Sequence, residues 1–292
     1  MRYAILSDIH GNDEALRAVF EDMARVSREQ SSPVHQVWCL GDVVGYGPEP
    51  GECVRRIRSR CDICIPGNHD WAAVGRIDLA DFSSAAADSA LWTRDHLKPD
   101  ERVYLRSLPE VTQVGDFTLA HGSPSNPIWE YLTSAAAAAP NFSAFDTTYC
   151  VVGHSHLPLI FLQPSNAEHI PLAPFNRAME SKVALAMALP GGLSRRAMEE
   201  GSNESTSQHF GACQRITPSS GHWVLPTGHR AIINPGSVGQ PRDGDPRASY
   251  VIYDSDLGFE FRRVPYDVGA TQRKLRGSGL SDKLAERLAN GV

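Results

Sequence analysis

Five short polar segments, each directly after an apolar run typical of a β-strand, constrain the fold of this chain more than any other feature. They are Asp8-Ile9-His10, Gly41-Asp42-Val43-Val44-Gly45, Gly67-Asn68-His69-Asp70, His121-Gly122 and Gly153-His154-Ser155-His156. In open α/β sheets the carboxyl ends of the strands line the ligand crevice. Such a sheet would bring two carboxylates, four imidazoles and one carboxamide from these segments to one place as ligands.

The first half of the chain alternates between strand and helix patterns, which indicates parallel βαβ units and an α/β fold. Leu16, Val19 and Met23 follow helical spacing, and Asn12 is a suitable N-cap for a helix over Asp13–Arg28. Strands are predicted at Arg2–Ser7, Gln36–Leu40, Asp62–Ile65, Val111–Val114, Phe117–Ala120 and Thr148–Val152. Further helices are predicted at Glu52–Arg60, Ser83–His96, Asp100–Ser107 and Ala135–Ala139.

The pattern breaks after Gln163. One short helix is expected over Arg177–Leu189, whereas Gly191–Gln208 is polar and aperiodic and is typical of a loop. Regular structure is expected to return in strands at His222–Leu225, Ala231–Asn234, Ser249–Asp254 and Phe259–Val264, and in helices that start at Val268 and Ser281. We therefore expect residues 1–292 to form a single domain with an irregular insertion at about 163–229.

The charge balance argues against nucleic acid as a partner. The 292 residues include 28 Lys and Arg against 34 Asp and Glu, a formal net charge of −6, whereas proteins that bind nucleic-acid backbones usually carry a basic excess. No apolar run approaches the roughly 18–20 residues needed to cross a bilayer, and the N-terminus lacks a signal-peptide pattern. We expect a cytoplasmic protein that does not bind membranes; the sequence leaves its oligomeric state open.

The six cysteines do not form an evident zinc or disulfide framework. Cys61 and Cys64 make a CxxC pair, but side chains three residues apart on a strand point to opposite faces. A second such pair, which a zinc site would need, is missing. We expect free thiols in a reducing compartment.

The side chains of the five polar segments suit transition metals. Oxygen and imidazole ligands without thiolate favour Mn, Fe, Zn or Co over Ca or Mg. The set exceeds one coordination sphere but fits two ions that share a carboxylate, which would attract phosphate strongly. Paired metals roughly 3.5–4 Å apart are suited to displacement at phosphorus.

Each segment alone has an ordinary explanation. A single Asp-x-His or His-x-His is a weak indication of a ligand pair, Gly-Asn is common in turns, and a single histidine is usually a core or surface residue. The five segments occur together, in order and after strand-like runs, and this combination favours a metal site.

This ordered set resembles the calcineurin-like metallophosphoesterase superfamily, whose pattern is D-x-H, G-D-x-x-G, G-N-H-D/E, H and G-H-x-H. The resemblance covers residues 7–156, and the stretch Ile233–Asp254 is similar to a bacterial branch of small phosphodiesterases often labelled diadenosine-tetraphosphatase-like. It implies a two-sheet αββα sandwich with a dinuclear metal site at the carboxyl ends of the strands.

The resemblance also implies roles for individual residues. Asp8, His10 and His156 would hold one metal, Asp42 would bridge, and Asn68, His121 and His154 would hold the other. As catalytic residues, His69 would face the substrate and Asp70 would orient His69.

The second segment departs from one branch of the superfamily. Protein Ser/Thr phosphatases continue it with an Asp-Arg pair, which the sequence Gly41–Gly47 lacks, so a phosphoprotein phosphatase is disfavoured. Arg242 and Arg247 are candidate replacements, because a guanidinium can bind two phosphate oxygens, although an ordinary charged loop explains them equally well. Tyr46 is a further candidate for substrate binding.

The function expected from these residues is metal-dependent hydrolysis of a phosphodiester or phosphoanhydride in a nucleotide-like substrate, with a hydroxide bridging the two metals as the nucleophile. The alternatives are a phosphomonoesterase, a nuclease, which the negative charge argues against, and a non-catalytic interaction scaffold of the same fold. A scaffold of this kind would lose ligand or general-acid histidines, whereas this chain retains all of them.

Overall fold

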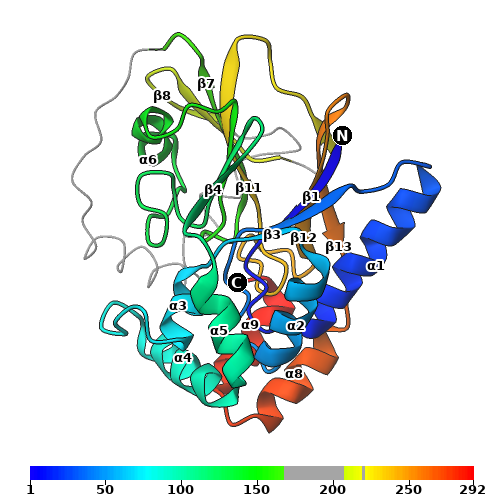
Figure 1. Ribbon diagram of the computed structural model, residues 1–292, viewed down its shortest axis with the longest axis vertical. Helices are drawn as coiled ribbons and strands as arrows, with labels where there is room; N and C mark the ends of the chain where they lie inside the picture. Colours follow the sequence, from blue (N-terminus) through cyan, green and yellow to red (C-terminus); the bar gives the residue numbers. More distant parts are fainter. Residues whose placement is uncertain (168–206, 219–220) are drawn as a thin grey trace.

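The computed structural model describes residues 1–167, 207–218 and 221–292. In this part of the chain two β-sheets pack against each other, with helices on their outer faces (Figure 1). The first sheet contains, in spatial order, β10 (Gly221–Trp223), β13 (Gly258–Val264), β12 (Ala248–Asp254), β1 (Arg2–Leu6), β2 (Gln36–Cys39) and β3 (Ile63–Cys64). The second contains β4 (Val111–Val114), β5 (Phe117–Ala120), β6 (Tyr149–Val151), β11 (His229–Pro235), β7 (Pro158–Pro164), β9 (Cys213–Ile216) and β8 (Ser207–Phe210).

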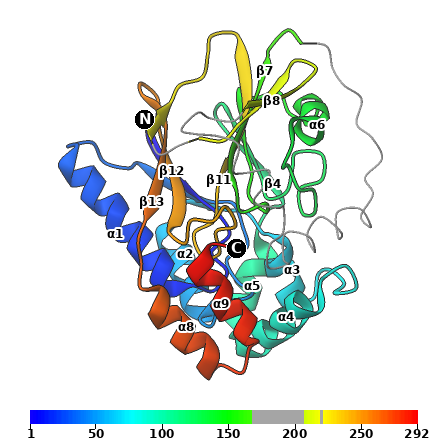
Figure 2. The same ribbon diagram turned by 180° about the vertical axis from the view of Figure 1, so that it is seen from behind.

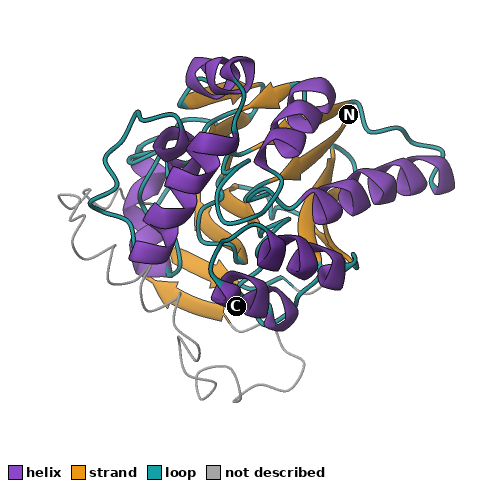
Figure 3. Ribbon diagram, turned by 90° about the horizontal axis from the view of Figure 1, so that it is seen from below, coloured by secondary structure: helices purple, strands orange, loops and turns teal. Residues whose placement is uncertain are grey.

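Most helices gather at one end of the molecule, in front of the strands when it is seen from below (Figure 3). They are α1 (Asp13–Glu29), α2 (Pro50–Arg60), α3 (Asn68–Ala73), α4 (Ser84–His96), α5 (Pro99–Ser107), α8 (Val268–Gly277) and α9 (Asp282–Asn290). The short α6 (Ala135–Ala138) and the 3₁₀ helix η1 (Ala139–Ser143) lie on the other side, against the second sheet (Figure 2). None of the helices in the described ranges is long and apolar enough to cross a membrane.

Alternation along the strands builds the layers, because successive side chains point to opposite faces. On β1, Ile5 packs with Phe117 and Ile233 of the second sheet, whereas Ala4 and Leu6 pack against the buried faces of α1 and α2. Apolar surface is thereby buried both between the sheets and under the helices. The expected two-sheet αββα sandwich is confirmed.

The segment expected to be irregular, 163–229, contains strands among its described residues. β7 extends into it, and β8, β9 and β10 lie within it. These strands were not predicted, apart from the β10 region, because their sequences show little alternation of apolar and polar residues. The predicted helix Arg177–Leu189 and most of the predicted loop Gly191–Gln208 fall outside the described residues.

We expected Cys61 and Cys64 to lie on one short strand, but the structure places them on different elements. Cys61 caps the end of α2 and Cys64 belongs to β3. All six cysteines are free.

Parallel pairing places the polar segments together. β1, β2 and β3 run parallel, as do β5, β6 and β11, so their carboxyl ends lie at one edge of each sheet. The loops there are joined by backbone hydrogen bonds, from Gly153 N–H to the His121 carbonyl at 2.7 Å and from Asp8 N–H to the Gly41 carbonyl at 3.0 Å.

Candidate metal centre

The loops that carry the polar segments are strained. Seven non-glycine residues among those described have positive φ angles, and six of them belong to or adjoin the segments: Asp8, His10, Asp42, Tyr46, His154 and His156. In this conformation Cβ crowds the following carbonyl, and such strain concentrates at functional sites. The loops stabilise each other, since His10 N–H donates to the Asp42 carbonyl at 2.9 Å.

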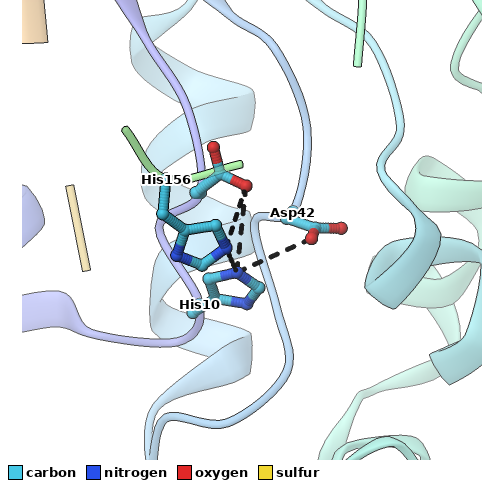
Figure 4. Close-up of side chains that lie close together, drawn as sticks. His10, Asp42 and His156 are labelled. Atoms are coloured by element: carbon cyan, nitrogen blue, oxygen red, sulfur yellow. Dashed lines mark hydrogen bonds and ion pairs between the residues drawn. The ribbon is translucent and has the colours of Figure 1, made fainter. Parts of the chain in front are cut away.

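Two groups of buried side chains share Asp42. The first is Asp8, His10, Asp42 and His156, and the second is Asp42, His121 and His154; in each group one ligand atom per residue lies within 4.8 Å of the others. His10 Nε2 lies 3.6 Å from Asp42 Oδ2 and 3.1 Å from His156 Nε2 (Figure 4). His121 Nε2 lies 3.3 Å from the same oxygen of Asp42. This oxygen therefore stands between the two groups.

Backbone carbonyl groups orient all four imidazoles. The Nδ1 atoms of three of them contact carbonyls: His10 with Val44 at 3.1 Å, His121 with Leu40 at 2.8 Å and His156 with Gln240 at 2.6 Å. In His154 it is Nε2 that contacts a carbonyl, that of Trp129, at 3.2 Å. A ring nitrogen beside a carbonyl carries a proton, so the other nitrogen presents its lone pair when the ring is neutral. Metal-binding histidines are usually held in this way.

The arrangement fits cations. Two imidazole lone pairs, on His10 and His156, face each other at 3.1 Å and would repel without a positive charge between them. Among the described residues, Asn68 Oδ1 is buried without a hydrogen-bond partner. Buried acceptors of this kind cost free energy unless something binds them. Oxygen and nitrogen donors without thiolate suit divalent Mn, Fe, Zn or Co.

The pKa values follow from burial and the mutual charges. Burial would raise the pKa of Asp42, but the His121 and His69 imidazoles outweigh it and hold that pKa below its usual range. Burial raises the pKa of Asp8 to about 7. Burial would lower the pKa of His121, but Asp42 outweighs it and raises that pKa to about 9. A proton thus balances Asp42 in the metal-free protein, and a bound metal would displace it.

His69 lies beside the ligands and points its ring at the same space. Its backbone N–H donates to Asp42 Oδ1 at 2.8 Å. Its ring contacts those of His10 and Tyr46, with centroids 5.0 and 4.4 Å apart. Nδ1 of His69 is buried without a partner among the described residues, and burial lowers the pKa of this imidazole to about 4. The ring is therefore held by packing while one polar atom remains available.

The sequence suggested that Asp70 orients His69, but in the structure Asp70 does not bind the His69 ring. Its Oδ1 accepts from Val44 N–H at 3.1 Å and its Oδ2 from Gly67 N–H at 2.9 Å. Oδ1 thus joins α3 to the loop after β2, whereas Oδ2 caps the first turn of α3 itself. The sequence missed the contact with Val44 because this backbone group is more than twenty residues away.

Two glycines allow the close approach of the loops. A Cβ at Gly67 would lie 2.0 Å from Asp42 Oδ1, and one at Gly153 would lie 2.0 Å from Ser7 Oγ and 2.9 Å from Asp8 Oδ2. Any larger residue would displace a ligand carboxylate.

Residues 1–160 match the family described as Calcineurin-like phosphoesterase, a range that contains all seven metal ligands expected from the sequence. The chain belongs to the calcineurin-like phosphoesterase family. It is a metallophosphoesterase, a hydrolase that acts on phosphoric ester bonds, and this family uses divalent metals.

Full-length relatives agree with this assignment. The chain is 32% identical to Uncharacterized protein MJ0912 of Methanocaldococcus jannaschii, over 99% of this chain and 97% of that protein. The crystal structure of a metallophosphoesterase from Sphaerobacter thermophilus is similar at 38% identity with a TM-score of 0.73, and covers 100% of this chain and 99% of that one. Hypothetical protein PH1004 from Pyrococcus horikoshii OT3, at 17% identity and a TM-score of 0.68, covers 100% and 98% and shares the fold.

In this calcineurin-like phosphoesterase the two candidate arginines lie in different surroundings. Arg242 donates from Nη2 to Gln240 Oε1 at 2.9 Å, and after burial its charge is the largest cause of the lowered pKa of His156. Arg247 is 51% exposed and pairs with Asp245 at 2.6 Å. The structure brings Arg242 to the metal centre but not Arg247, because the neighbouring carboxylate holds Arg247 at the surface.

Proposed function

We propose that this protein holds two divalent ions and hydrolyses a phosphodiester or phosphoanhydride bond in a nucleotide-like substrate. Asp8, His10 and His156 would hold one ion; Asn68, His121 and His154 would hold the other; Asp42 would contact both. The observation that carries the proposal is that two buried ligand groups share Asp42. Mn, Fe, Zn and Co all suit these ligands.

When bound, such ions neutralise phosphate charge and activate a water molecule for attack on phosphorus. The residues of the chain supply the remaining interactions. His69, with an unpartnered Nδ1 beside the ligands, would donate a hydrogen bond or proton to the leaving oxygen. Arg242 would bind a non-bridging phosphate oxygen. Asp70 would keep α3, and with it Asn68 and His69, against the loop after β2.

Aromatic rings beside the centre support a nucleotide-like substrate. His69 lies between Tyr46, with centroids 4.4 Å apart, and Phe82, at 5.2 Å, and Phe82 in turn contacts Trp129 at 5.2 Å. Aromatic faces pack well against planar groups such as a base.

The location and the domain organisation are also proposals. Free cysteines throughout the chain support a reducing, cytoplasmic location. The cores that join both halves of the chain support one domain over residues 1–292.

The proposal is tested with a substrate panel on protein reconstituted with each metal. The panel contains nucleotide phosphodiesters, dinucleoside polyphosphates and phosphomonoesters, and the readout is kcat/KM. We expect diesters or polyphosphates to exceed monoesters, and chelation to abolish turnover. A preference for monoesters, or full activity after exhaustive chelation, would contradict it.

A further inference from the structure

A second arginine, which no motif marks, lies on the last helix of the chain, beside the metal centre. Arg287 lies on α9, whose buried residues Leu284 and Leu288 pack in one cluster with Tyr46. The residue after this helix, Gly291, accepts a hydrogen bond from Gly244 N–H at 2.9 Å. Figure 2 shows the C-terminus at the loops in the middle of the molecule. The carboxyl end of α9 is thereby fixed against the loop that carries Arg242.

Both guanidinium groups have unsatisfied donors. Arg287 donates from Nε to the Val292 carbonyl at 2.8 Å, but its Nη2 is buried without a partner. Arg242 donates from Nη2 to Gln240, but its Nε is buried without a partner. Buried donors without acceptors cost free energy. Among the described residues these atoms therefore lack the acceptor that an anion would supply.

The two charges also repel each other. Burial, and after it the positive charge of Arg242, lower the pKa of Arg287 to about 10. The repulsion between the two guanidinium groups destabilises the free protein. An anion bound between them relieves both the repulsion and the missing hydrogen bonds.

A small pocket lies between α9 and the metal centre. It is lined by His10 and Tyr46 from the centre, Gln240 from the Arg242 loop, and Leu284 and Leu288 from α9. Helix α9, the Arg242 loop and the metal centre therefore meet at this place.

We propose that Arg242 and Arg287 form an anion subsite beside the metal centre, which binds a second phosphate of the substrate, separate from the phosphate that is hydrolysed. This rests on the proposed function and narrows it: the preferred substrate carries two phosphates. Arg287 is then a specificity-determining residue, and the C-terminal helices α8 and α9 form one wall of the substrate site.

Binding of non-hydrolysable probes tests the subsite without turnover. Methylphosphonate and methylenediphosphonate are titrated calorimetrically into metal-loaded wild type, Arg287→Met and Arg287→Lys. Met retains the packing of the side chain and removes the charge. We expect wild type to bind the diphosphonate more tightly, Arg287→Met to weaken diphosphonate binding at least about tenfold more than methylphosphonate binding, and Arg287→Lys to lie between.

Arg273→Met on α8 is the matched control, since Arg273 is 71% exposed; both of its dissociation constants should equal those of wild type. Metal content and the thermal midpoint are measured for every variant, so that loss of metal or of folding is seen directly. Equal weakening of both probes in Arg287→Met, at unchanged metal content, would overturn the subsite.

A second assay separates this inference from the proposed function. Thymidine 5′-(p-nitrophenyl phosphate) is compared with the same diester carrying a 3′-phosphate, so that the scissile bond is identical. We expect wild type to favour the 3′-phosphorylated diester and Arg287→Met to lose that preference. If wild type cleaves neither ester in any metal, the proposed function fails, while the phosphonate titration still decides the subsite.

Discussion

Asp42 combines more roles than any other residue of the centre. It belongs to both ligand groups and accepts the backbone N–H of His69. Asp42→Asn replaces one carboxylate oxygen with an NH₂ group, which cannot bind a cation. We expect the variant to lose metal from both groups and kcat/KM to fall by at least about 10²-fold. Metal analysis after dialysis, together with kinetics, measures both effects.

The control for Asp42→Asn is Asp256→Asn, an exposed turn residue that should retain metal and activity. If Asp42→Asn kept all of its metal, Asp42 would not be shared between the ions.

His69 lies beside the expected metal ligands but belongs to neither of the two groups that share Asp42. His69→Ala should retain metal, since every ligand remains, and should lose kcat by roughly 10²–10⁴, which is typical of a general acid. The loss should be smaller on a p-nitrophenyl diester than on a nucleotide diester, because nitrophenolate leaves without protonation. Equal losses on both esters would mean that His69 positions the phosphate, and loss of metal would mean that it is a ligand.

At the scale of single residues, the sequence identifies those candidates that lie close together in a short motif. Asp8 and His10, or His154 and His156, lie two residues apart, so a local motif identifies them. Arg287 could not be found in this way, because it is one of several charged residues on a short amphipathic helix. Its position depends on where α9 packs, which local sequence does not determine.

Helix α3 is the element on which the centre depends most. It has six residues, begins with Asn68 and ends near carbonyls that two distant arginines bind. Arg94 donates to the Ala72 carbonyl at 3.0 Å, and Arg106 donates to the Val74 carbonyl from Nε at 3.2 Å. Such a short helix is marginal without tertiary contacts, and cations favour its carboxyl end.

We expect Arg106→Met to lower the free energy of unfolding by about 1–2 kcal/mol. It should also weaken binding of the metal ion that Asn68 is proposed to hold, because α3 presents this residue. Urea unfolding and metal titration measure the two effects. Arg58→Met, at an exposed ion pair of 3.5 Å with Asp100, is the control, and a variant Arg106→Met that matched it in both measurements would refute this role.

Elements were predicted where their pattern is long or their pairing is local. The helix with apolar spacing around Leu16 was found almost to its ends, and the Asn12 cap is present, with Ala15 N–H 3.2 Å from Asn12 Oδ1. β9 was missed because its only buried residue is Cys213, so no alternation marks it. Its stability comes from pairing with β7 and β8, which is not visible in its own sequence.

For the whole molecule, the layered fold follows from the family resemblance, but the strand order does not. β12 pairs antiparallel with β1 although nearly the whole chain separates them. This pairing joins the two halves of the first sheet and brings the Arg242 loop to the centre. Both ends of the chain therefore contribute to the site, although the expected ligands all precede residue 160.

A buried charged network joins the same two ends. Asp22 on α1 accepts from Tyr250 Oη at 2.8 Å and from Arg262 Nε at 2.8 Å, and also binds Arg25. Burial would raise the pKa of Asp22, but the hydrogen bonds from Arg262, Tyr250 and Arg25 outweigh it and lower that pKa. The network thus joins α1 to β12 and β13, and it is stronger when Asp22 is ionised.

Stability should therefore depend on pH through Asp22. Because its folded-state pKa is lowered, its contribution is complete above the unfolded value of about 3.9 and is lost as the pH falls through the folded value. We expect Asp22→Asn to cost about 2 kcal/mol at neutral pH, with the difference from wild type constant down to about pH 5 and narrowing below about pH 4. Urea unfolding across this range measures it, with Glu21→Gln, exposed on the same helix, as the control. A difference that stayed constant at acid pH would contradict this role, because protonation of Asp22 would then have removed none of its stabilising contribution.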